Sequence, residues 1–238
     1  MLTCNDRSQF ERVRAEHPGA SVITRIFWPG KPPPFEEWMA YPLRDWEPDR
    51  TLGQQIHNIM DLGYDTFELL NEPNLVHEGW GPTVEDAWQF NCWACETIPL
   101  LRERYPGVKL LWPAMGYDLE GSDLWWWGRC KKSIRFCDGL AAHAYWQPAE
   151  EMFTLRWGRR YWYLRDIYPG MPLWITEAGN TDPNTSKAKK VWQYIGFCEM
   201  AELDGVKGVA FWLLEGSRVD PDWEAEQNCF FDEEMAEK

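Results

Sequence analysis

Short apolar runs alternate with longer amphipathic segments along most of the chain, and this alternation limits the folds that are open to it. The runs are typical of buried strands, and the segments between them are long enough to form crossover helices. Strands that alternate with helices in this way build parallel sheets from right-handed βα units. The sequence therefore predicts an α/β protein organised around a parallel sheet.

The expected strands lie at residues 21–27, 66–70, 108–112, 139–145, 172–176 and 206–214. The expected helices lie at residues 6–16, 52–60, 84–105, 124–134, 153–168 and 187–203. Residues 2–4 are interpreted as the remnant of a further strand before the first helix. The sequence thus shows six clear strands and one doubtful one, and residues 220–238 are expected to form an acidic tail at the surface.

The composition excludes several classes of partner. The formal net charge of −14 argues against nucleic acid or an anionic membrane surface as the main partner. No apolar run approaches the 18 or so residues of a membrane span. Residues 1–10 show no basic stretch followed by an apolar one, so no secretory signal is visible. If Met1 is the natural start we expect a cytoplasmic protein, and a secreted one if an upstream signal precedes it.

The seven cysteines include one C-x-x-C pair, Cys92 and Cys95. The surrounding residues have helical periodicity, so both thiols are expected to pack on a helix, with a metal or redox role as the lesser alternative. No second pair follows at zinc-site spacing and the chain has only four histidines. Neither a cofactor nor a metal is expected.

Two carboxylates occupy equivalent places along the chain. Glu72 follows the apolar run FELL within FELLNEPN, and Glu177 follows the run PLWIT. Two expected strands lie between them. Active sites collect at the carboxyl ends of parallel strands, where side chains distant in sequence converge. Asn-Glu-Pro alone is a weak signal, but the second glutamate makes a catalytic pair the preferred interpretation.

Other expected strands carry groups that suit the same polar pocket. Arg25 lies in the first clear strand, His143 and Tyr145 lie in GLAAHAY, and Trp212 lies in the last strand. A single histidine on an apolar strand is usually a satisfied core group. Recurrence of polar and aromatic groups on several strands of one sheet indicates a binding site instead.

The motifs FELLNEPN, HAY and WITE together resemble those of the clan A glycoside hydrolases, over residues 21–215. FELLNEPN and HAY look most like the xylosidase and iduronidase branch, and WITE is also similar to small endo-β-1,3-glucanases. The resemblance implies a TIM-type (β/α)8 barrel, N-terminally incomplete within this chain, and a single catalytic domain over residues 1–238. Since the clan places its acid/base on strand four, we expect part of the barrel to be missing before FELLNEPN.

The resemblance also implies a retaining mechanism by double displacement on a β-linked oligo- or polysaccharide. Glu177 would attack the anomeric carbon, and Glu72 would act as acid and then as base. Asn71 would bind the sugar 2-hydroxyl, while Tyr145 and Arg25 would hold Glu177.

Four tryptophans are candidates for sugar binding, because a flat indole matches the apolar face of a sugar ring. By resemblance Trp212 would form the floor under the sugar that is cleaved. Trp28, Trp80 and Trp146 follow expected strand ends and are candidates for outer subsites. His143 is the remaining candidate binding residue.

Two other functions remain as alternatives. The missing strands and the 17 tryptophans are also compatible with a non-catalytic carbohydrate-binding barrel, a pseudoenzyme. A metal-dependent hydrolase is the weakest alternative, because His and Asp ligands do not cluster. If the barrel is open, its unpaired strand edges allow a homodimer.

Overall fold

The computed structural model describes residues 2–3, 7–28, 30–43, 50–117, 121–182 and 184–211. The chain divides into two compact units, residues 1–141 and 142–238. The boundary falls inside strand β5, Gly139–Trp146, so this strand contributes residues to both units.

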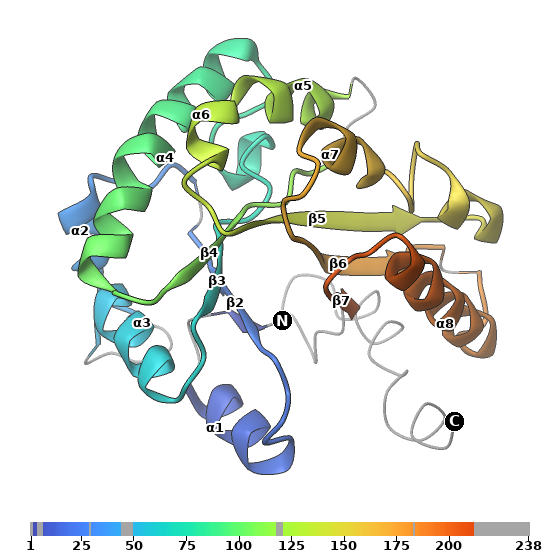
Figure 1. Cartoon of the computed structure of the whole chain (residues 1–238), viewed down its shortest axis with the longest axis horizontal. Coiled ribbons are helices and arrows are strands. Elements are labelled where there is room, and N and C mark those ends of the chain that lie inside the picture. The colour runs from blue at the N-terminus through green and yellow to red at the C-terminus, as the bar shows by residue number, and fades with distance from the viewer. Residues whose placement is uncertain are drawn as a thin grey trace. The chain divides into compact units, whose positions relative to one another are not determined.

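Unit 1 consists of parallel strands connected by helices (Figure 1). Its strands are β1 Leu2–Thr3, β2 Ile23–Ile26, β3 Thr66–Leu69 and β4 Lys109–Trp112, followed by the start of β5. Its helices are α1 Arg7–Glu16, α2 Phe35–Met39, α3 Leu52–Asp61, η1 Val76–Glu78, α4 Val84–Arg104, α5 Ser122–Arg129 and α6 Lys131–Ile134. Each strand pairs with the next one in the chain, in parallel.

The doubtful strand at the N-terminus is real, since β1 pairs with β2 through Leu2 and Thr24. FELLNEPN therefore follows the third described strand, and the fourth and fifth strands, β4 and β5, separate it from the strand of Glu177. The order of strands between the two glutamates is as predicted.

Helix boundaries in unit 1 follow local signals. Thr51 and Thr83 each close a capping box at the start of α3 and α4, in which the threonine side chain accepts from the third residue of the helix. The helix expected at 124–134 is broken at Cys130 into α5 and α6, and both pieces pack on α4. Cys92 and Cys95 lie half-buried on α4 as free thiols.

An aromatic cluster forms the core between α4 and the sheet. The ring of Phe90 contacts Trp80 at 4.8 Å, Trp112 at 5.1 Å and Trp126 at 5.5 Å between centroids. All four rings are buried. Fully burying a side chain of this size stabilises the fold by roughly 1.5–3 kcal/mol, so the cluster holds α4 and α5 against β4.

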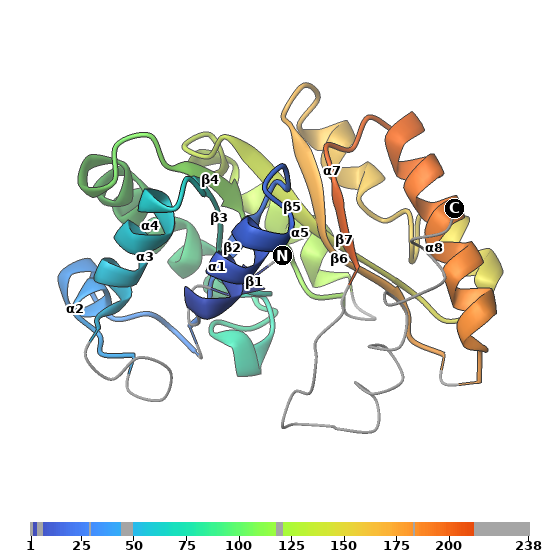
Figure 2. The same ribbon diagram turned by 90° about the horizontal axis from the view of Figure 1, so that it is seen from below.

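Unit 2 contains the rest of β5 and two further strands (Figure 2). Its elements are η2 Ala149–Phe153, α7 Trp162–Ile167, β6 Leu173–Asn180, α8 Lys187–Leu203 and β7 Val209–Phe211. Strand β6 lies between β5 and β7, and it pairs with β7 in parallel. Helix α8 packs against β6 and β7, with Tyr194 stacked on Phe211 at 4.3 Å.

Two predicted elements of unit 2 need correction. The helix expected at 153–168 is wrong, because only Trp162–Ile167 is α-helical and turns precede it. The strand expected at 172–176 continues to Asn180, so Glu177 lies within β6 rather than after its end. Trp212 and the expected acidic tail lie outside the described residues. None of the helices in the described part of the chain combines the length and apolar character needed to cross a bilayer.

A buried aspartate joins the end of α8 to the residues around the start of α7. Asp204 accepts hydrogen bonds from Arg159 at 2.9 and 2.6 Å, from the Tyr161 hydroxyl at 2.6 Å and from the Trp162 indole at 2.8 Å. Burial acts to raise the pKa of Asp204, but these donors outweigh it and the pKa lies below its ordinary value of 3.8.

Replacing Asp204 with alanine should lower the free energy of unfolding by roughly 3 kcal/mol, because three donor residues lose their acceptor. This value is at the low end for a broken buried ion pair, because Arg159 is partly exposed. The pKa of Asp204 is lowered on folding, so its contribution is present above pH 3.8 and is lost as the pH falls through the lower folded value. Urea unfolding at neutral and acidic pH measures both effects. The exposed Asp166 is the matched control, and equal effects of D204A and D166A would contradict the prediction.

Candidate active site

The backbone leaves β3 through a strained turn. Leu70 has φ +67° and Glu72 has φ +33°, and they are the two non-glycine residues with positive φ in the described chain. A non-glycine residue in this region costs about 1–3 kcal/mol and persists only where its surroundings hold it. Leu70 is held by its burial and by its N–H, which donates to the Ile26 carbonyl at 3.1 Å. Strain of this kind concentrates at functional sites, and here it sets the position of the predicted acid/base.

The loop beyond Glu72 is fixed by the fully buried side chain of Asn74. Its Nδ2 donates to the Gly116 carbonyl at 2.8 Å and to the Ser122 hydroxyl at 3.0 Å, and its Oδ1 accepts from the Gly116 N–H at 2.7 Å. A Cβ at Gly116 would lie 2.5 Å from the Leu75 side chain, so a larger residue at this position would force Leu75 to move. The loop after β3 is thereby joined to the loop after β4. Sequence reasoning missed this role of Asn74.

Arg25 binds Glu68 in a buried ion pair. Its Nε and one terminal nitrogen each lie 3.0 Å from Glu68 Oε2, and Glu68 Oε1 accepts from the Ala114 N–H at 3.1 Å. Arg25 and Glu68 are direct partners in the register of β2 and β3, which explains the pairing. Sequence reasoning did not single out Glu68. The expected contact of Arg25 with Glu177 stays a prediction.

Asn71 and Glu78 form a second polar contact after β3. Asn71 Nδ2 donates to Glu78 Oε1 at 3.2 Å. The pKa of Glu78 is raised above its ordinary value, first because the carboxyl is partly buried and also because Glu72 carries like charge, while the hydrogen bond from Asn71 opposes the shift. Sequence reasoning did not select Glu78 as a site residue, because Glu78 lies several residues after the end of the strand.

In unit 2 the carboxylate of Glu177 is held by two side chains of β5. The Tyr145 hydroxyl donates to Oε2, and His143 Nε2 lies 3.6 Å from Oε1. His143 and Tyr145 alternate along β5, so they project to the same face of the strand. Glu177 is only 7% exposed. The structure thus brings together three of the residues that the sequence selected, and supplies the predicted contact between Tyr145 and Glu177.

The tryptophans selected as outer subsites behave differently from one another. Trp146 is 1% exposed, stacks on Phe197 at 5.0 Å and donates from its indole nitrogen to Gln193, so it is a core residue of unit 2. Trp80 is also buried, within the aromatic cluster of unit 1. The prediction that they are sugar platforms is corrected, because a platform needs an exposed ring face. Trp28 is partly exposed, and its ring contacts that of Tyr41.

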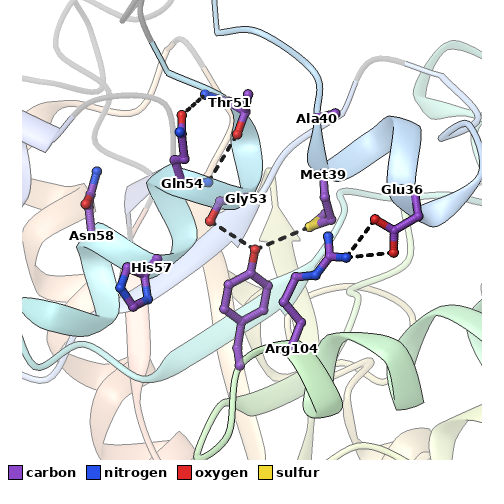
Figure 3. A pocket seen from close by; sticks show the side chains of 10 residues that line it. Glu36, Met39, Ala40, Thr51, Gly53, Gln54, His57, Asn58 and Arg104 are labelled. Carbon is purple, nitrogen blue, oxygen red and sulfur yellow. Dashed lines mark hydrogen bonds and ion pairs between the residues drawn. The ribbon is translucent and has the colours of Figure 1, made fainter.

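A hollow of about 450 Å³ opens on unit 1 between α2, α3 and the end of α4 (Figure 3). Tyr105 forms part of its wall, and its hydroxyl donates to the Gly53 carbonyl at 2.9 Å. At its rim Arg104 is paired with both oxygens of Glu36, at 2.6 and 2.7 Å. None of the predicted catalytic residues lines it. Nor is any group of three or more His, Cys, Asp or Glu in the described chain arranged to hold a metal ion.

The chain resembles known proteins in structure but not detectably in sequence. No protein-family model and no curated protein matches the sequence. The solved structures that match include AbfB, a family 51 α-L-arabinofuranosidase from Bifidobacterium longum, with a TM-score of 0.58 and 11% identity. The match covers 87% of this chain and 50% of AbfB, so this chain spans half the length of that protein.

Two GH128 enzymes are also similar in structure. A curdlan-specific exo-β-1,3-glucanase from Blastomyces gilchristii has a TM-score of 0.54 and 15% identity, over 88% of this chain and 82% of the glucanase. An endo-β-1,3-glucanase from Amycolatopsis mediterranei has a TM-score of 0.51 and 19% identity, over 87% and 83%. The chain shares the fold of these solved enzymes. It is a (β/α)8-type barrel fold, represented by seven parallel strands among the described residues where a complete barrel has eight.

The strained turn gives a test on stability. Glu72→Gly should be more stable than Glu72→Ala by about 1 kcal/mol, because glycine adopts positive φ without the Cβ penalty. Urea unfolding measures the difference. The same pair of substitutions at Glu96, an exposed residue inside α4, is the control and should show the opposite order, because glycine weakens a helix interior. Equal stabilities of the two Glu72 variants would show that the turn is not strained.

Proposed function

We propose that this chain is a retaining β-glycoside hydrolase that cleaves O-glycosidic bonds of a β-linked oligo- or polysaccharide. One observation carries the proposal: the nearly buried carboxylate of Glu177 accepts a hydrogen bond from Tyr145 and lies beside His143. Oriented polar groups around a nearly buried carboxylate suit a nucleophile, because they fix which carboxylate oxygen can reach a substrate.

In the proposed first step, Glu177 attacks the anomeric carbon and forms a glycosyl-enzyme ester. The hydrogen bond from Tyr145 fixes which carboxylate oxygen is turned to the sugar. As the ester forms, the charge on Glu177 is lost. In the second step water attacks the ester and releases the sugar with its original configuration.

Glu72 is proposed as the acid that protonates the leaving oxygen and then as the base that deprotonates the water. Its position after β3 supports this role, since the strained turn and the buried Asn74 fix the loop that carries it. Correct placement of such a group raises the rate of the chemical step, because the reacting atoms are already held in the required geometry.

The structural neighbours support the choice of substrates to test first. They include exo- and endo-β-1,3-glucanases with a similar fold. We therefore propose β-1,3-glucan oligosaccharides as the first substrates, with Trp28 and its neighbour Tyr41 as an outer sugar contact.

A mechanism-based inhibitor tests the nucleophile directly. Activated 2-deoxy-2-fluoro glycosides of the gluco, xylo and manno series should label the intact protein, and peptide mass spectrometry should place the label on Glu177. Glu177→Gln should remain unlabelled. Glu72→Gln should still be labelled, because an activated leaving group needs no acid. A label on another residue would overturn the assignment. Sugar binding in wild type and Glu72→Gln, with turnover in neither, would favour a carbohydrate-binding protein instead.

Removing the hydroxyl of Tyr145 tests how Glu177 is held. Tyr145→Phe should lower kcat by about 100-fold with a smaller change in KM, since the lost hydrogen bond orients the nucleophile rather than the whole substrate. Steady-state kinetics on an aryl glycoside measure this. Tyr163→Phe, at an exposed position of α7, is the matched control and should be unchanged. A Tyr145→Phe enzyme with normal kcat would count against Glu177 as the nucleophile.

A further inference from the structure

Glu78 is tied to the same loop as Glu72 through the backbone. Its N–H donates to the Leu75 carbonyl at 3.0 Å, and the Leu75 N–H donates to the Glu72 carbonyl at 2.9 Å. The carboxyl of Glu78 is half-buried. The short helix η1 thus holds a third carboxylate near the predicted acid/base, at a place that neither the sequence motif nor the proposed mechanism uses.

The contact between Glu78 and Asn71 decides which way the Asn71 amide is turned. The two ends of an amide have almost the same shape, but one donates and the other accepts. Asn71 Nδ2 donates to Glu78 Oε1 at 3.2 Å, whereas Oδ1 is buried and makes no hydrogen bond to the described residues. Turning the amide over would place its oxygen against the Glu78 carboxylate, and two acceptors repel each other. Glu78 therefore selects one of two orientations.

We propose that Glu78 is a positioning residue, which fixes the Asn71 amide so that its second N–H is presented as a donor to a sugar hydroxyl. The sugar in this statement rests on the proposed function, while the orientation of the amide does not. The charged and titratable groups that act on the Glu78 carboxyl are Glu72, His77 and Arg25. Arg25 is itself bound to Glu68, and Glu78 accepts its hydrogen bond from Asn71.

Kinetics of a double-mutant cycle test the positioning role. Glu78→Leu should lower kcat/KM by roughly ten-fold, the size expected when a hydrogen bond to a charged group is lost. Glu78→Gln keeps an acceptor of the same shape and should recover most of the activity. In an Asn71→Ala background Glu78→Leu should have no further effect, because the two residues act as one unit. Additive effects of the two substitutions would overturn the proposal.

Nuclear magnetic resonance tests the orientation without relying on activity. The side-chain NH2 signals of Asn71 in the ¹⁵N-labelled full chain are assigned by their loss in Asn71→Ala. They should shift in Glu78→Leu and stay close to the wild-type position in Glu78→Gln. Glu103→Leu, an exposed site on α4, is the control and should leave them in place. Glu78→Ala replaces the leucine variant if the latter does not fold. Unchanged Asn71 signals without Glu78 would refute the proposal.

The two proposals fail in distinguishable ways. If the wild-type protein hydrolyses none of the β-glycosides, the proposed function fails and the Asn71 signals alone decide the role of Glu78. If the wild type is active but both the cycle and the signals are insensitive to Glu78, the positioning role fails and the hydrolase stands.

Discussion

The hydrogen bonds of Asn74 to the backbone of Gly116 hold the part of unit 1 on which the candidate site depends. They join the loop after β3 to the loop after β4, where Leu75 also lies against Gly116. The left-handed backbone at Leu70 and Glu72 requires support of this kind, because an unsupported chain would relax to ordinary φ values. The buried amide of Asn74 therefore helps to keep the backbone that carries Glu72 in place.

Charge is arranged differently around the two glutamates. In unit 1 the surroundings of Glu72 include a buried arginine already neutralised by Glu68 and the partly buried carboxyl of Glu78. In unit 2 the contacts of Glu177 include the Tyr145 hydroxyl and the His143 imidazole. The charges near Glu72 thus include a second carboxyl, whereas the polar groups that contact Glu177 fix the position of its carboxylate.

The comparisons and the geometry contribute different parts of the functional proposal. Similarity to enzymes at 11–19% identity establishes the fold and leaves the chemistry open, because one fold supports many activities. The proposed chemistry therefore depends on the groups around Glu177 and Glu72. The hollow beside Arg104 shows that surface shape alone does not locate the candidate active site, because none of the candidate catalytic residues lines this hollow.

The sequence by itself determined most of the succession of strands and helices, and it placed each glutamate at or near the end of a separate strand. These follow from local hydrophobic periodicity, which short stretches of chain encode. The contact of Tyr145 with Glu177 was implied by the resemblance to glycoside hydrolases. Only the tertiary structure decided that Arg25 binds Glu68, that Glu78 holds Asn71 and that Trp146 is buried. These outcomes depend on strand register, loop path and helix packing. Each joins groups through the folded chain, and no local sequence pattern specifies which polar partner or neighbouring surface a side chain will meet.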